Sequence, residues 1–178
     1  MFLITGIPAS GKSTVAQALA ERLPRSAHVR GDAFRRMIVG GRAEALPGDG
    51  TGDVAALTEE ALRQLRLRHS LAAASADAYA ASGFTPVLQD VILGDELPRT
   101  IALLRTRPLH VVVLVPSPEA IAAREAGRKK RAYGAWTPAD LDRALRAGTP
   151  RIGLWLDTSR QTPQETVDAI LRHAGPTG

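Results

Sequence analysis

The sequence predicts an α/β domain in which a parallel sheet is covered by helices on both faces. Three observations support this prediction. Apolar segments alternate with amphipathic helical segments, some of the apolar segments (VVVLV, for example) are hydrophobic at every position, and a glycine-rich turn joins the first strand to the first helix. A strand that is apolar on both faces is typical of a parallel sheet that lies between two helical layers.

The N-terminal half supplies the first three strands. A strand is expected at 2–5, a helix at about 12–23, a short strand at 27–30, a small helix from Ala33, a glycine-rich loop at 40–52, a long helix at 58–82 and a strand at 84–91. Thr58 is the expected N-cap of the long helix, and Gly83 is its expected stop.

The C-terminal half repeats the alternation. A helix is expected at 95–106, a strand at 109–115, a helix at 117–131, another helix from Thr137-Pro138, a strand at 152–156 and a terminal helix that opens with the capping box at 162–165. We find no internal repeat and no linker, so residues 1–178 are expected to form a single domain.

Composition limits the classes of protein. The chain has 178 residues, of which 44% are hydrophobic and 23% charged, and a net charge of +5. The absence of cysteine excludes disulfides, thiolate metal sites and cysteine nucleophiles. No apolar run approaches the roughly 18 residues of a membrane span. We therefore expect a soluble cytoplasmic protein with no membrane partner, and the composition does not indicate its oligomeric state.

The strongest motif is GIPASGKST, which matches G-x-x-x-x-G-K-[ST] between a strand and a helix. In such a P-loop (Walker A motif), backbone N–H groups converge on phosphate and the helix N-terminus adds positive potential. Lys12 is expected to reach the β and γ phosphates and the Ser13 hydroxyl to bind Mg²⁺. The expected nucleotide-binding residues are Gly6, Ala9, Ser10, Gly11, Lys12, Ser13 and Thr14.

Asp32 follows the second predicted strand, where ligands bind in open α/β sheets. A carboxylate there can accept the proton of a substrate hydroxyl that attacks the γ-phosphoryl group. The alternative is a helix N-cap ahead of Ala33. Arg35, one turn further along, is a candidate contact for an anionic acceptor, and the alternative is a solvated surface arginine.

Asp90 ends the strand in PVLQDVILG, a position that resembles a Walker B aspartate. We expect it to hold Mg²⁺ and to border the substrate, with a turn residue as the alternative. Asp157 follows the last strand at the edge that holds the P-loop, where its loop could contact adenine.

The segment REAGRKKR, residues 124–131, carries a net charge of +4. Arg124 and Arg128 are one helical turn apart, so both can neutralise charge on the transferring phosphoryl group from a lid at about 124–136. The alternatives are a solvated helix face or a nucleic-acid patch with Tyr133 and Trp136. The four histidines have no metal-ligand spacing.

Together, GIPASGKST, Asp32, QDVILG and the arginines at 124 and 128 resemble the P-loop small-molecule kinases, in particular the chloramphenicol phosphotransferase-like group, which is related to zeta-toxin, shikimate and gluconate kinases. The resemblance implies a five-stranded parallel sheet of order 2-3-1-4-5, Asp32 as general base, and ATP with Mg²⁺ as phosphoryl donor. Chloramphenicol phosphotransferases carry an acidic pair at the third strand end, where this chain has Gln89 first, so the acceptor stays open.

The resulting expectation is an ATP- and Mg²⁺-dependent phosphotransferase acting on a hydroxyl of a metabolite, nucleoside or antibiotic. Two alternatives stay open. GDAFRRMI is similar to the R-D-D-x-R stretch of polynucleotide 5′-hydroxyl kinases, with Arg35 as the candidate contact to a 3′ phosphate. A P-loop regulator that binds nucleotide without small-molecule kinase activity is the other, although the chain lacks asparagine and therefore the N-K-x-D guanine signature.

Overall fold

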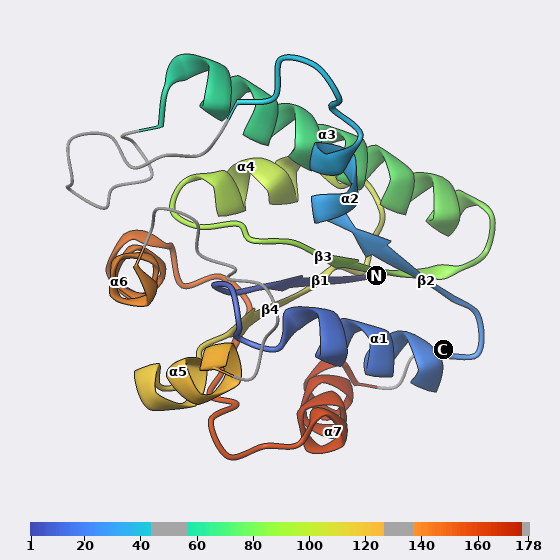
Figure 1. The fold of residues 1–178 in the computed structure, drawn as a ribbon. Helices are drawn as coiled ribbons and strands as arrows, with labels where there is room; N and C mark the ends of the chain where they lie inside the picture. Colours follow the sequence, from blue (N-terminus) through green and yellow to red (C-terminus); the bar gives the residue numbers. More distant parts are fainter. Residues whose placement is uncertain (44–56, 127–136, 176–178) are drawn as a thin grey trace.

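Five parallel strands form a single sheet in the order β2-β3-β1-β4-β5 (Figure 1). The computed structural model describes residues 1–43, 57–126 and 137–175. The strands are β1 (Phe2–Thr5), β2 (Ser26–Arg30), β3 (Thr85–Gln89), β4 (His110–Leu114) and β5 (Leu154–Leu156). The predicted fold class and strand order are confirmed.

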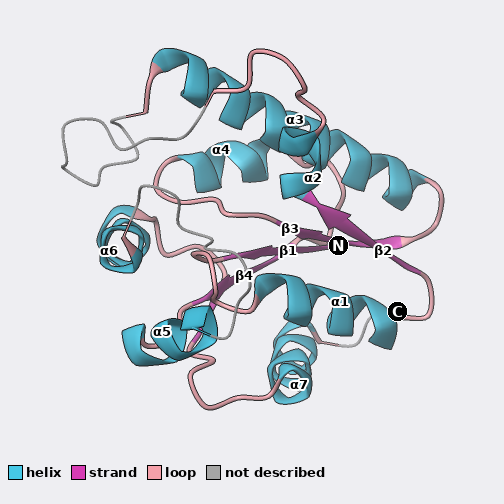
Figure 2. Ribbon diagram, in the orientation of Figure 1, coloured by secondary structure: helices cyan, strands magenta, loops and turns pink. Residues whose placement is uncertain are grey.

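Helices cover both faces of this sheet (Figure 2). They are α1 (Lys12–Arg22), α2 (Gly31–Arg36), α3 (Glu59–Ala81), α4 (Glu96–Leu103), α5 (Pro118–Ala126), α6 (Pro138–Gly148) and α7 (Pro163–Ala174). Helices α1 and α7 pack on one face, and α3, α4 and α6 pack on the other. The sheet is therefore the middle layer of three.

The alternation of side chains along β1 explains the two cores. Phe2 and Ile4 pack with α1 and α7, whereas Leu3 packs with α3, and all three are fully buried. Strand β4 is buried on both faces in the same way. Burying both faces requires strands that are apolar at every position, which is the pattern read in the sequence.

Several elements have other bounds than predicted: α2 begins at Gly31 rather than at Ala33, and β3 spans Thr85–Gln89 rather than 84–91. Two further differences have a clear structural cause. Helix α4 ends at Leu103 rather than at 106, because the buried carboxylate of Asp77 accepts the N–H groups of Arg105 and Thr106. Strand β5 begins at Leu154 rather than at 152, after Gly153 adopts a positive φ of 74° against the carbonyl of Val111. Long-range contacts set both ends.

Part of the predicted elements lies outside the described residues. This applies to most of the loop at 40–52, to the end of the helix at 117–131, and to the lid at 124–136 beyond Ala126. Within the described part of the chain, no helix combines the length and apolar character that crossing a bilayer requires.

Candidate active site

The site lies at the edge of the sheet where the parallel strands end. Arg30, Gln89 and Ile4 are in register at the ends of β2, β3 and β1. The chain continues from β2 into α2, from β3 into the segment that contains Asp90, and from β1 into the P-loop. This edge therefore brings Asp32, Asp90 and the P-loop into one region.

The P-loop has an unusual backbone. Gly6 has a φ of 147°, and a Cβ on it would lie 2.7 Å from the Leu114 carbonyl oxygen, so glycine is required there. Ala9 has a φ of 59°, in the left-handed region that L residues seldom adopt. Such outliers cluster at ligand sites, where the surrounding structure holds them in place.

Lys12 lies inside this loop rather than in solvent. Its side chain is buried, and Nζ donates a hydrogen bond of 2.7 Å to the Ile7 carbonyl. Ser13 and Thr14, at the start of α1, are exposed. The loop thus places a cation at its centre and two hydroxyls at its mouth, next to the N–H groups at the N-terminus of α1.

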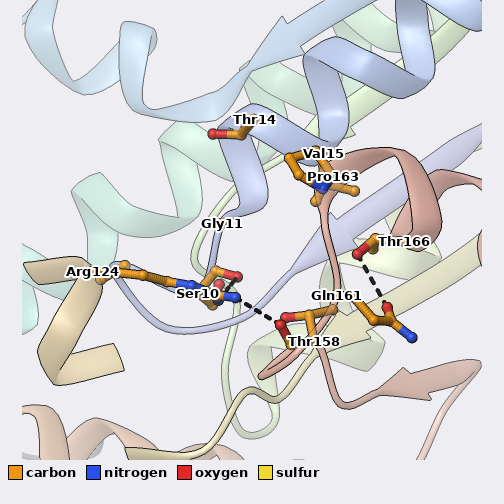
Figure 3. A pocket seen from close by; sticks show the side chains of 10 residues that line it. Ser10, Gly11, Thr14, Val15, Arg124, Thr158, Gln161, Pro163 and Thr166 are labelled. Carbon is orange, nitrogen blue, oxygen red and sulfur yellow. Dashed lines mark hydrogen bonds between the residues drawn. The ribbon is translucent and has the colours of Figure 1, made fainter. Parts of the chain in front are cut away.

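Arg124 reaches the P-loop from the last turn of α5. Its guanidinium donates to the carbonyl of Ser10, at 3.2 Å, and to the carbonyl of Thr158, at 2.6 Å (Figure 3). It therefore joins the P-loop to the loop between β5 and α7. The expected partner Arg128 lies outside the described residues.

A cavity of about 310 Å³ opens beside Arg124. Its walls come from the P-loop, α1, α5, the loop before α7 and the first turn of α7 (Figure 3). The hydroxyls of Ser10 and Thr158 are buried and make no hydrogen bond among the described residues. The cavity therefore offers a flat arginine, hydroxyl-bearing side chains and some apolar surface to a ligand.

Asp157 makes local contacts. It accepts the N–H of Ser159 at 2.9 Å and also the Ser159 hydroxyl, and these bonds lower the pKa of Asp157. Ser159 Oγ in turn accepts the N–H of Ser117, at 2.7 Å. Asp157 thus shapes the loop that lines the cavity, and its expected contact with adenine stays a prediction.

Asp32 lies in the first turn of α2, and the cap position belongs to Arg30, so the N-cap alternative is wrong. The carboxylate pairs with Arg36 one turn further on, and Oδ1 is 3.9 Å from Arg30 Nε. Oδ1 is buried and makes no hydrogen bond within the described part of the chain. Arg35 is partly buried in the same helix.

Asp90 is buried and already paired. Its two carboxylate oxygens accept Nε, at 2.7 Å, and Nη2 of Arg68 on α3. Neighbouring His69 is also buried, and burial lowers its pKa, so the ring is neutral near pH 7 and Arg68 is the cation beside Asp90. Among the described residues, no group of three or more His, Asp or Glu is arranged to hold a metal.

Sequence reasoning missed Arg68. Arg68 carried a readable signal, because it is seven residues after Ala61 and four before Ala72, on the small-residue face that α3 buries. A charged residue on such a face needs a buried partner.

The chain matches the family model described as an AAA domain over residues 1–148. The chain belongs to this family. A comparison with curated protein sequences finds no match.

Solved structures of kinases resemble this AAA-domain protein. A sugar kinase from Janibacter sp. HTCC2649 is 19% identical with a TM-score of 0.67, covering 97% of this chain and 92% of its own. A gluconokinase from Sinorhizobium meliloti 1021 is 20% identical with a TM-score of 0.58, covering 97% and 89%. The Mycobacterium tuberculosis APS kinase, solved with AMPPNP and APS, is 16% identical with a TM-score of 0.67, covering 97% and 95%. The predicted resemblance to P-loop small-molecule kinases is confirmed at the level of the fold.

Proposed function

We propose that this protein is an ATP- and Mg²⁺-dependent phosphotransferase that phosphorylates a hydroxyl group of a small molecule. One observation carries the proposal: a P-loop with a buried lysine shares a sheet edge with the carboxylate of Asp32, one oxygen of which makes no hydrogen bond within the described residues. A phosphate site beside a carboxylate with remaining acceptor capacity suits transfer to a hydroxyl.

The donor would bind along the P-loop. Lys12 would exchange the Ile7 carbonyl for the β and γ phosphates, and the N–H groups around Gly11 would bind phosphate oxygens. The cavity beside Arg124 has room for a base, which the hydroxyls of Ser10 and Thr158 could read. Its size and mixed lining support a purine nucleotide, and ATP is our choice.

Magnesium would sit at the exposed Ser13 hydroxyl, an oxygen ligand of the kind it prefers. When bound, it would supply positive charge that offsets the charge building up on the γ-phosphoryl group. Asp90 as a second ligand stays a prediction, since its carboxylate is engaged by Arg68.

On the acceptor side, the hydroxyl oxygen would form a bond to the γ-phosphorus while the bond to the β–γ bridging oxygen breaks. Asp32 would take the proton, and ADP would leave. Arg35 is the proposed contact to the acceptor. Arg124, together with Arg128, would stabilise charge on the transferring group.

The test begins with binding of a nonhydrolysable ATP analogue, measured by calorimetry with and without Mg²⁺. A panel of sugars, nucleosides and hydroxylated antibiotics is then screened by thermal shift in the presence of the analogue, and the hits are assayed for phosphoryl transfer from radiolabelled ATP. We expect analogue binding and Asp32-dependent labelling of at least one small molecule. Transfer to 5′-hydroxyl oligonucleotides alone would favour the polynucleotide kinase, and binding without transfer to any acceptor would favour the regulator.

A further inference from the structure

We propose that the ion pair between Asp90 and Arg68 is a positioning device that holds the first turn of α2, and with it Asp32, at the sheet edge. The importance of this position for catalysis rests on the proposed function.

The carboxylate of Asp90 is fixed on every side. Both oxygens accept Arg68, and Oδ1 also accepts the N–H of Val91, at 2.8 Å. The exposed fractions are 3% for the Asp90 side chain and 13% for that of Arg68. A side-on, two-point contact of this kind fixes the carboxylate plane as well as its position.

This carboxylate packs against the start of α2. A Cβ on Gly31 would lie 2.0 Å from Asp90 Oδ2 and 2.4 Å from its Cγ. Gly31 has no positive φ, so its lack of a side chain serves this close approach and not an unusual backbone. Because Gly31 immediately precedes Asp32, the place of Asp90 determines where the first turn of α2 can lie.

The backbone of the same segment is tied to the P-loop strand. Asp90 donates its N–H to the Ile4 carbonyl, at 3.2 Å. The Thr5 hydroxyl accepts the Ile92 N–H at 3.0 Å and donates to the Ile92 carbonyl at 2.9 Å. The pair thus stands between the strand that enters the P-loop, the helix that carries Asp32, and α3.

The pair also argues against Asp90 as a direct metal ligand, because a metal would have to displace Arg68 from both oxygens. The two roles predict different results for Asp90→Asn and Arg68→Gln. If Asp90 binds metal, Asp90→Asn should lower metal affinity, and Arg68→Gln, which frees the carboxylate, should leave it unchanged or higher. If Asp90 positions α2, Arg68→Gln should loosen α2, and Asp90→Asn should leave metal affinity unchanged.

The first measurement is hydrogen exchange of the α2 amides, which needs neither nucleotide nor acceptor. We expect Gly31→Ala and Arg68→Gln each to speed exchange in residues 31–37 by about fivefold or more. Gly148→Ala is the matched glycine control, because a Cβ at Gly148 meets nothing within 4 Å. Arg66→Gln is the matched arginine control, because Arg66 lies on α3 like Arg68 but pairs with Glu96 of α4 instead of with Asp90.

Arg68→Gln leaves Asp90 buried without its cation, which can prevent folding. Two other variants avoid this problem. Gly31→Ala keeps every charge, and the double variant Arg68→Gln/Asp90→Asn leaves a neutral pair, so the test stands even if Arg68→Gln does not fold. Equal hydrogen-exchange rates of the α2 amides in Gly31→Ala and Gly148→Ala would overturn the proposal. This outcome does not depend on which acceptor the protein phosphorylates.

The second measurement separates positioning from general destabilisation. With the acceptor found by the screen, Arg68→Gln alone should lower kcat. In the Asp32→Asn background the same substitution should lower kcat by less than about a further twofold, because the ion pair acts through Asp32. Mn²⁺ binding with the ATP analogue, followed by electron paramagnetic resonance, should be equal in wild type and Asp90→Asn. Independent, multiplicative losses in the double variant, or Mn²⁺ binding lost in Asp90→Asn, would contradict a positioning role.

Discussion

The donor and acceptor sides of the site are held in different ways. On the donor side, Lys12 and Arg124 donate to backbone carbonyls of Ile7, Ser10 and Thr158. On the acceptor side, the arginines pair with carboxylates, as Arg36 does with Asp32 and Arg68 with Asp90. One side is built on main-chain geometry and the other on matched side chains.

This difference matters for specificity. Carbonyl and N–H groups are present whatever the side chains are, so a phosphate site built on them suits a donor common to many enzymes. Side-chain pairs change with single substitutions, so the acceptor side can be altered without losing the P-loop. We therefore expect substitutions on the acceptor side to affect transfer and those on the donor side to affect nucleotide binding.

The largest expected effect is on the acceptor side. Asp32→Asn keeps the shape of the side chain and an acceptor for Arg36 but removes the base, so phosphorylation of the acceptor should fall by about 10² to 10⁴. Affinity for the ATP analogue should be unchanged, as measured by calorimetry.

The matched control is Asp168→Asn. Asp168 is ion-paired with Arg22 and is 45% exposed, against 40% for Asp32. It should leave the transfer rate unchanged. An Asp32→Asn enzyme with the wild-type transfer rate would remove the base from the mechanism.

Lys12→Ala tests the donor side. The substitution removes a phosphate contact that strengthens as charge develops, so turnover of ATP should fall by about 10² or more. Circular dichroism and thermal unfolding should show a folded protein, because Lys12 contributes a contact to a loop carbonyl and not to either core. Turnover of ATP near the wild-type rate would exclude the P-loop from the reaction.

A third prediction concerns Asp77, a buried carboxylate of α3 that faces neither substrate. Burial raises the pKa of Asp77, but hydrogen bonds from Thr106 and Arg105 outweigh it, so the pKa lies below its ordinary value. Asp77→Asn should lower the free energy of unfolding by about 2 kcal/mol near neutral pH. Transfer kinetics should change little.

The sign of the pH dependence follows from the lowered pKa. The folded state binds the proton of Asp77 less readily than the unfolded state, whose pKa is about 3.9. The stabilisation is therefore complete well above that pH and is lost as the pH falls through the folded pKa. Urea titrations of wild type and Asp77→Asn should give a constant difference between pH 7 and 5 that shrinks below about pH 4. A difference that grows on acidification would show that the carboxylate is not stabilising.

The smallest effect is expected at Arg124. Arg124→Gln removes two charge-assisted hydrogen bonds to carbonyls beside the cavity, so the Kd of the ATP analogue should rise by about tenfold, while KM for the acceptor stays the same. The kcat for transfer should also fall, because Arg124 is the proposed contact to the transferring phosphoryl group. Wild-type analogue affinity together with wild-type kcat would remove Arg124 from both roles.

Local sequence determined the strand–turn–helix of the P-loop, because the motif and its flanks lie within about fifteen residues. The same holds for the capping boxes at Thr137 and Thr162, which each link residues three apart. The strand order came from family resemblance and not from any local pattern. Asp32 and Asp90 could be selected because strand ends in parallel sheets face ligands.

Only the tertiary structure decided which groups these residues meet. Arg68 and Asp90 are 22 residues apart, and Arg124 and Ser10 are 114 apart. Pairing over such distances depends on where the sheet places each helix, and no periodicity of the chain encodes it. The end of α4, set by Asp77 across 28 residues, has the same origin. Buried charges and N–H groups must find partners, and the fold decides which partners are within reach.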